Sequence, residues 1–129
     1  MAEAIHPSGK LALQTVAMPK DTNANGDIFG GWLVSNMDMA AGIEAKKRAK
    51  SRVVTAAIDN LVFIKPVVVG EIVGCYVGLL SIGRTSMRFQ VEVWTDSISN
   101  FNEGLKKVAQ GLFTFVAIDD KRKPQSVER

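Results

Sequence analysis

The stretch that decides the fold is GGWLVSNMDMAAGIEAKKRAK, residues 30–50. It contains no proline, consists largely of good helix formers, and ends in a basic run that complements the negative end of a helix dipole. The sequence therefore predicts one long helix from Gly30 or Gly31 to about Lys50. Its first half is apolar around most of its circumference, which is typical of a helix buried on several sides. We expect a core helix that other elements cover.

One β-rich run precedes this helix and four follow it. Residues 84–94 give the clearest strand, because polar and apolar side chains alternate along them with a period of two. Prolines, glycines and a polar loop over residues 96–106 separate the other runs, which are residues 10–18, 53–64, 72–82 and 107–118. Four consecutive strands with short connections favour an antiparallel meander that wraps the helix. We predict an α+β fold with a curved five-stranded antiparallel sheet.

The chain has 129 residues, 47% of them hydrophobic and 22% charged, which is the composition of one ordinary globular domain. Its last eleven residues, DDKRKPQSVER, include seven charged ones. We therefore expect a single domain over residues 1–118 and a solvated tail over residues 119–129.

Several classes of protein are excluded by what the sequence lacks. The longest stretch without a charge, residues 72–83, is 12 residues long, whereas a membrane helix needs about 20. The first ten residues lack the basic start and apolar segment of a secretory signal. The lone cysteine, Cys75, cannot close an intrachain disulfide and is interpreted as a small buried hydrophobe. We expect a cytoplasmic protein with no membrane association.

The only histidine is His6, near the N-terminus. Catalytic triads and Cys-His pairs need an imidazole beside the nucleophile, and zinc hydrolases usually take two or three histidine ligands. We therefore expect chemistry without a metal, carried by carboxylates, amides and backbone donors.

Asp38 is the strongest candidate for such chemistry. It lies in the apolar half of the helix, where burying an unpaired carboxylate costs several kcal/mol. A buried aspartate satisfied by hydrogen bonds explains this position as well as a general base or nucleophile does. The absence of a usable histidine favours the catalytic interpretation.

The start of the same helix offers backbone donors. The amides of Gly30 and Gly31 lie at the positive end of the helix dipole, where they suit a developing oxyanion, although paired glycines also let a helix begin close to a sheet. Asn23 could orient a carbonyl or a water, but asparagine is also common in turns. Gly31 and Asp38 are about 10 Å apart along one helix axis, so a site that uses both needs a second subunit.

A net charge of +3 favours an anionic ligand without demanding nucleic acid. One basic cluster, residues 46–52, is interpreted as a solvated helix end, with contact to a ligand as the alternative, and a second cluster lies at residues 121–123. An RNA-reading surface requires exposed aromatic residues among its basic residues, and neither cluster contains any. We therefore expect no nucleic-acid partner. Another set of residues could contact a phosphate or simply form a hairpin turn: Gly83, Arg84, Thr85 and Ser86.

The segment AMPKDTNANGDIFGGWLVSNMD, residues 17–38, resembles the start of bacterial YciA-like acyl-coenzyme A thioesterases, which are related to brain-type acyl-CoA hydrolases. The resemblance continues through RVVTAAIDNLVFIKPVVVGEIV and VGLLSIGRTSMRFQVEVW and covers most of the chain. It implies a hot-dog fold, in which a curved antiparallel sheet wraps a long helix, and assembly into homodimers and commonly into trimers of dimers.

The resemblance also implies site residues. Asp38 matches the family's catalytic aspartate, Asn23 matches the asparagine that assists at the thioester, and Gly31, with Gly30 as the alternative, matches the amide that polarises the carbonyl. The turn from Gly83 to Ser86 resembles a region suited to coenzyme A. The implied activity is hydrolysis of acyl-CoA to a free acid and coenzyme A, with no cofactor beyond the coenzyme of the substrate. The alternative is a hot-dog module that binds acyl-CoA without cleaving it.

Overall fold

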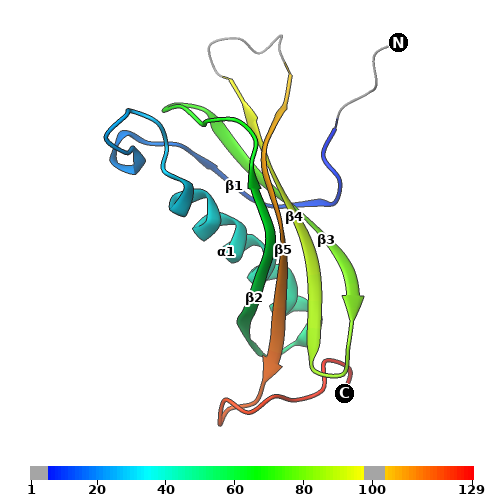
Figure 1. The fold of residues 1–129 in the computed structure, drawn as a ribbon. Helices are drawn as coiled ribbons and strands as arrows, with labels where there is room; N and C mark the ends of the chain where they lie inside the picture. Colours follow the sequence, from blue (N-terminus) through cyan, green and yellow to red (C-terminus); the bar gives the residue numbers. More distant parts are fainter. Residues whose placement is uncertain (1–5, 98–103) are drawn as a thin grey trace.

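The computed structural model describes residues 6–97 and 104–129, and one long helix lies across the face of a curved five-stranded antiparallel sheet (Figure 1). In chain order the elements are β1 (Lys10–Val16), the short 3-10 helix η1 (Pro19–Asp21), α1 (Gly30–Ala49), β2 (Arg52–Phe63), β3 (Ile72–Ile82), β4 (Ser86–Asp96) and β5 (Lys106–Ile118). The predicted order of strand, helix and four strands is confirmed. The alternating strand lies two residues later than predicted, because residues 83–85 form the turn before it.

Helix α1 begins and ends for local reasons. Phe29 precedes it in an extended conformation, and Gly30 is its first residue. At the other end Lys50 adopts a left-handed conformation, with φ of 53°, and its N–H donates to the carbonyl of Lys46 at 2.8 Å. This capping conformation ends the helix after Ala49, and β2 starts only two residues after Lys50.

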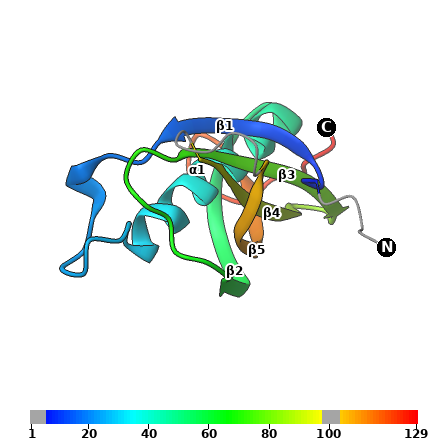
Figure 2. The same cartoon turned by 90° about the horizontal axis from the view of Figure 1, so that it is seen from above.

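The order of strands in the sheet is β1-β3-β4-β5-β2, so the predicted meander of four consecutive strands is wrong. Strands β3, β4 and β5 follow one another, but β2 pairs with β5 at one edge and β1 pairs with β3 at the other. Helix α1 lies across one face of this sheet (Figure 2), and its first residue, Gly30, lies against the ring of Phe63 at the end of β2. Only two residues link the end of α1 to the start of β2.

One side of α1 packs on the sheet, mainly through small residues that let the helix approach closely. The buried helix residues are Leu33, Met37, Ala40, Ala41, Ala45 and Ala49. The opposite side is open, and Met39 is 53% exposed. The expectation that the helix is buried on several sides is therefore wrong for one chain, because a single sheet covers only one side of it.

The C-terminal tail folds back on the body, so the expectation of a solvated tail is wrong for its last residues. Val127 is 4% exposed, and its N–H donates to the carbonyl of Arg84. The guanidinium of Arg129 donates to the carbonyl of Ala49 at 2.9 Å and thereby caps α1. Residues 120–124 are exposed, as their charge predicts.

No helix in the described parts of the chain is long and apolar enough to cross a membrane.

Candidate active site

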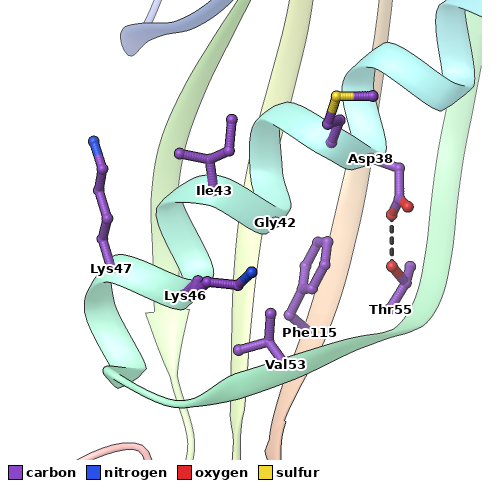
Figure 3. A pocket seen from close by; sticks show the side chains of 9 residues that line it. Asp38, Gly42, Ile43, Lys46, Lys47, Val53, Thr55 and Phe115 are labelled. Carbon is purple, nitrogen blue, oxygen red and sulfur yellow. Dashed lines mark hydrogen bonds between the residues drawn. The ribbon is translucent and has the colours of Figure 1, made fainter.

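Asp38 lies in the third turn of α1 and points toward β2 (Figure 3). The hydroxyl Oγ1 of Thr55 donates to Oδ1 of Asp38 at 2.6 Å. Thr55 lies opposite Phe115 on β5, and the pairing of the two strands is irregular immediately after it. The threonine holds one oxygen of the carboxylate, which leaves the other oxygen of Asp38 available to a ligand.

A pocket of about 530 Å³ extends from this carboxylate along α1. Two strands and the helix form its walls, and these walls are largely apolar, with a lysine pair at the end away from Asp38. The lining residues are Asp38, Met39, Gly42, Ile43, Lys46, Lys47, Val53, Thr55 and Phe115. A carboxylate at the edge of an apolar pocket suits a general base or nucleophile that acts on an uncharged reacting group.

Asn23 lies in the loop before the helix, where its side chain builds a turn. Oδ1 of Asn23 accepts from the N–H groups of Asn25 at 2.9 Å and Asp27 at 3.2 Å. The side-chain amide of Asn23 donates no hydrogen bond to any described residue and is exposed. The turn interpretation is therefore confirmed, and the hydrogen bonds to Oδ1 also hold the side-chain NH2 group in place.

The two glycines at the start of α1 have different surroundings. A Cβ on Gly30 would lie 3.1 Å from the ring of Phe63, so packing against β2 favours glycine there. A Cβ on Gly31 would make only ordinary contacts, 3.4 Å from the ring of Phe29. No side chain caps this helix start, so the fold leaves the amide of Gly31 exposed and free for a ligand.

Residues 83–85 form the turn between β3 and β4, and Ser86 begins β4, at the end of the sheet where α1 ends (Figure 1). The N–H of Gly83 donates to the carbonyl of Ser86 at 2.8 Å, and a Cβ on Gly83 would lie 2.9 Å from the Ser86 hydroxyl. The carbonyl of Thr85 accepts from Ala117 on β5. The hairpin interpretation thus accounts for the backbone of this segment, while the side chain of Arg84 remains exposed.

Within one chain these predicted residues do not meet. The pocket beside Asp38 is lined by neither Asn23 nor Gly31, and the β3–β4 turn does not reach it. Thr55, by contrast, was not identified from the sequence. A threonine in a β-rich run is common for reasons of strand propensity alone, so no sequence signal marks it.

The remaining unusual ionisable groups serve the fold. Burial raises the pKa of the Cys75 thiol to about 12, which makes it unreactive and agrees with its interpretation as a small hydrophobe. Among the described residues no group of three or more histidines, cysteines and carboxylates could hold a metal ion.

Comparison with known proteins identifies the family. Residues 25–100 match the thioesterase superfamily, and the YciA acyl-CoA thioester hydrolase of Escherichia coli is 45% identical over 94% of this chain and 92% of its own. The chain belongs to the thioesterase superfamily. The hot-dog fold that the family resemblance implied is confirmed. A solved hexameric hot-dog thioesterase of Campylobacter jejuni has a TM-score of 0.83 and 38% identity, with coverage of 93% of this chain and 92% of that one.

Two further solved structures from this superfamily bear on the site. A hexameric thioesterase from Yersinia pestis superposes with a TM-score of 0.91 at 45% identity and covers 96% of this chain and 99% of its own. An acyl-CoA hydrolase from Staphylococcus aureus, solved with butyryl coenzyme A and coenzyme A, has a TM-score of 0.78 at 36% identity, with coverage of 88% and 68%. Alanine variants of the S. aureus enzyme replace an asparagine and, fifteen residues later, an aspartate.

Proposed function

We propose that this protein hydrolyses acyl-coenzyme A thioesters to a carboxylic acid and coenzyme A, with Asp38 as the catalytic carboxylate. The observation that carries this is the position of Asp38, oriented by Thr55 at the edge of an apolar pocket in a chain of the thioesterase superfamily. Fifteen residues separate Asn23 and Asp38, the same spacing as between the asparagine and the aspartate replaced in the S. aureus acyl-CoA hydrolase.

Asp38 can act in two ways. As a general base it takes a proton from water while the water oxygen attacks the thioester carbonyl, the carbon–sulfur bond breaks, and the leaving thiolate takes up a proton. As a nucleophile it attacks the carbonyl itself, the carbon–sulfur bond breaks, and the thiolate leaves and takes up a proton; water then hydrolyses the resulting mixed anhydride, which releases the acid and regenerates the carboxylate of Asp38. The hydrogen bond from Thr55 serves both roles, because it fixes the carboxylate and occupies only one of its two oxygens.

The oxyanion needs hydrogen-bond donors, and in the described parts of the chain the predicted donors Asn23, Gly30 and Gly31 do not line the pocket beside Asp38. The exposed amide of Gly31, with Gly30 as the alternative, and the side-chain NH2 group of Asn23 provide them if they belong to a second subunit. Gly31 lies about 10 Å from Asp38 along one axis, which is too far for one carbonyl to contact both. We propose a catalytic site shared between the two chains of a homodimer.

The surface of β2 supports this assembly. β2 pairs with β5 on one side only, and four of its large apolar residues are at least 40% exposed: Val54, Ile58, Val62 and Phe63. An exposed apolar edge strand favours pairing with a second chain. We propose that the homodimer is the minimal unit and that three dimers form a hexamer, since the C. jejuni and Y. pestis proteins are hexameric. We also propose a cytoplasmic location, because the lone cysteine closes no disulfide.

A thiol-release assay with acyl-CoA substrates from acetyl to palmitoyl tests the function. Asp38→Asn is nearly isosteric and removes the charge, so we expect turnover to fall at least about a hundredfold while melting temperature and oligomer size stay the same. Thiol release by the wild type would exclude the alternative of a non-catalytic acyl-CoA-binding module. Near-normal turnover of a folded Asp38→Asn variant would refute the role of Asp38.

A further inference from the structure

Two phenylalanine rings flank the start of α1, and both are exposed. Phe29 immediately precedes the helix and is 42% exposed, and Phe63, the last residue of β2, is 50% exposed. A Cβ on Gly31 would lie 3.4 Å from the ring of Phe29, and a Cβ on Gly30 would lie 3.1 Å from the ring of Phe63. Each of the first two residues of the helix therefore has an aromatic ring beside it.

The backbone holds both rings in place. The N–H of Phe29 donates to the carbonyl of Asp21 at 3.1 Å, which ties the segment before the helix to η1. The N–H of Ile64, directly after Phe63, donates to the carbonyl of Val108 on β5 at 2.7 Å. Because the backbone is already fixed, these rings lose little conformational entropy when they bind a ligand.

Phe63 lies on the helix side of β2. Since successive side chains of a strand point to opposite faces of a sheet, Val62 points away from the helix, whereas the ring of Phe63 reaches Gly30. The ring thus borders the exposed surface of β2 on the side of the sheet that carries α1 and Asp38. A ligand bound at the start of the helix can contact it there.

The helix start is also where we propose that the oxyanion forms. Gly31 and Asp38 are seven residues apart, close to two full turns, so they lie on the same face of α1. The ring of Phe29 lies beside Gly31 on that face. When the Gly31 amide of one chain binds the carbonyl oxygen, the acyl carbons attached to that carbonyl begin beside Phe29 of the same chain.

The pocket beside Asp38 offers an alkyl chain a less suitable surface. Lys46 and Lys47 line the end of this pocket away from Asp38, so it ends in cations. Phe29 and Phe63 are not among the residues that line it. An alkyl chain gains free energy in proportion to the apolar area that it buries, so two half-exposed rings are the better surface for it.

We infer that Phe29 and Phe63 bind the acyl chain and make the protein prefer acyl groups longer than acetyl. Phe29 contacts the first carbons beyond the carbonyl, and Phe63 contacts the carbons that follow them. This inference rests on the proposed function and names the residues that select its substrate. Since the rings carry no hydrogen-bonding group, the surface suits an unsubstituted alkyl chain.

Substrates of different length test these roles. The ratio of kcat/KM for octanoyl-CoA to kcat/KM for acetyl-CoA reports the preference for the longer chain. Phe63→Ala should lower this ratio about tenfold, because contacts with several methylene groups are lost, and Phe63→Leu, which keeps apolar volume, should restore most of it. Phe29→Ala should lower kcat/KM for butyryl-CoA and octanoyl-CoA alike, because Phe29 contacts the carbons that these two acyl groups share.

Leu80→Ala and Val53→Ala are the controls. Leu80 is 52% exposed, but it lies on β3, which β4 and β5 separate from β2, so its truncation should change the ratio less than about twofold. Val53 lines the pocket beside Asp38. If Val53→Ala lowers the ratio and Phe63→Ala does not, the acyl chain lies in that pocket and the inference is wrong.

Sedimentation velocity and circular dichroism complete the test. We expect Phe63→Ala to stay folded and to keep the oligomer size of the wild type. Its dissociation would mean that the ring packs against a second chain rather than against substrate, which would overturn the inference. An equal loss of kcat/KM for acetyl-CoA and octanoyl-CoA would overturn it too. A wild type that hydrolyses no acyl-CoA would instead refute the proposed function, and this inference with it.

Discussion

Strands β4 and β2 differ in burial although both carry a series of large apolar side chains. β4 lies in the middle of the sheet, and Met87, Val91 and Val93 on it are fully buried. β2 lies at the edge, and Ile58 is 40% exposed although its partner across the strand pair, Phe113, is fully buried. The apolar residues on β4 thus pack in the core of their own chain, whereas those on β2 are available for contact with a second chain. Asp38 lies on the side of the molecule where β2 is, since it accepts a hydrogen bond from Thr55 on that strand.

On the face of β4 that points away from the helix, a cluster of polar residues is buried around Glu92, and β2 carries no such cluster. Glu92 is 5% exposed and accepts hydrogen bonds from the N–H of Ser8 at 3.0 Å and Nε1 of Trp94 at 2.9 Å. Nζ of Lys107 lies 3.2 Å from its other oxygen. Burial raises the pKa of Glu92, but these hydrogen bonds and the lysine charge together hold it below its ordinary value. This buried carboxylate stabilises the chain, whereas Asp38 lies at the edge of a pocket, where we propose that it acts on the substrate.

The largest effects on folding and assembly should come from introducing a lysine on β4 and, in a separate variant, on β2. Val91→Lys buries an unpaired ammonium in the core and should destabilise the chain by more than about 4 kcal/mol, which prevents folding. Ile58→Lys leaves its charge in water within one chain, so the variant should keep its circular dichroism but dissociate to monomers and lose activity. Sedimentation velocity and circular dichroism check both. A fully assembled Ile58→Lys variant would contradict the assignment of β2 to the dimer interface.

The shared site is tested by mixing two inactive variants. Asn23→Ala and Asp38→Ala, each expected to be nearly inactive alone, are coexpressed with different tags so that mixed dimers can be counted. In a mixed dimer one site carries both changes and the other carries neither. Random pairing makes about half of the dimers mixed, so roughly a quarter of wild-type activity should return. No recovery in verified mixed dimers would mean that one chain supplies both residues.

The polar cluster around Glu92 predicts that the free energy of unfolding depends on pH. Because the folded pKa of Glu92 is lowered, its contribution is present above its ordinary value of 4.5 and is lost as the pH falls below that value through the folded pKa. Glu92→Gln should therefore reduce the free energy of unfolding by about 2 kcal/mol at pH 7 and by less in acid. Urea titrations at pH 7 and pH 4 measure this difference. Turnover at pH 7 should stay unchanged, and a large loss of kcat would show that the cluster supports the site.

The smallest effect concerns the exposed turn between β3 and β4. Arg84→Ala should raise KM for acyl-CoA about threefold, raise it more than it lowers kcat, and lose this effect as salt screens the wild-type contact. Steady-state kinetics at low and high salt check it. An unchanged KM at low salt would mean that Arg84 is only a turn residue and that the phosphates bind elsewhere.

Much of this protein could be predicted from its sequence because local chemistry specifies it. Helix formers without proline predicted α1, and strict alternation predicted β4. A carboxylate in an apolar helix with no usable histidine singled out Asp38, whose catalytic role stays a prediction. The bounds of these elements moved by a few residues at most, since turns at Gly83 and Lys50 set them.

Only the tertiary structure decided what depends on contacts between distant segments. The placement of β2 beside β5, the hydrogen bond from Thr55 to Asp38, and the return of Val127 onto the body each join residues far apart in the chain. The ring of Phe63 against Gly30 joins the end of a strand to the start of the helix in the same way. Periodicity and propensity report which conformation a segment adopts, but not which segment packs beside it, because pairing is set by the free energy of the whole chain.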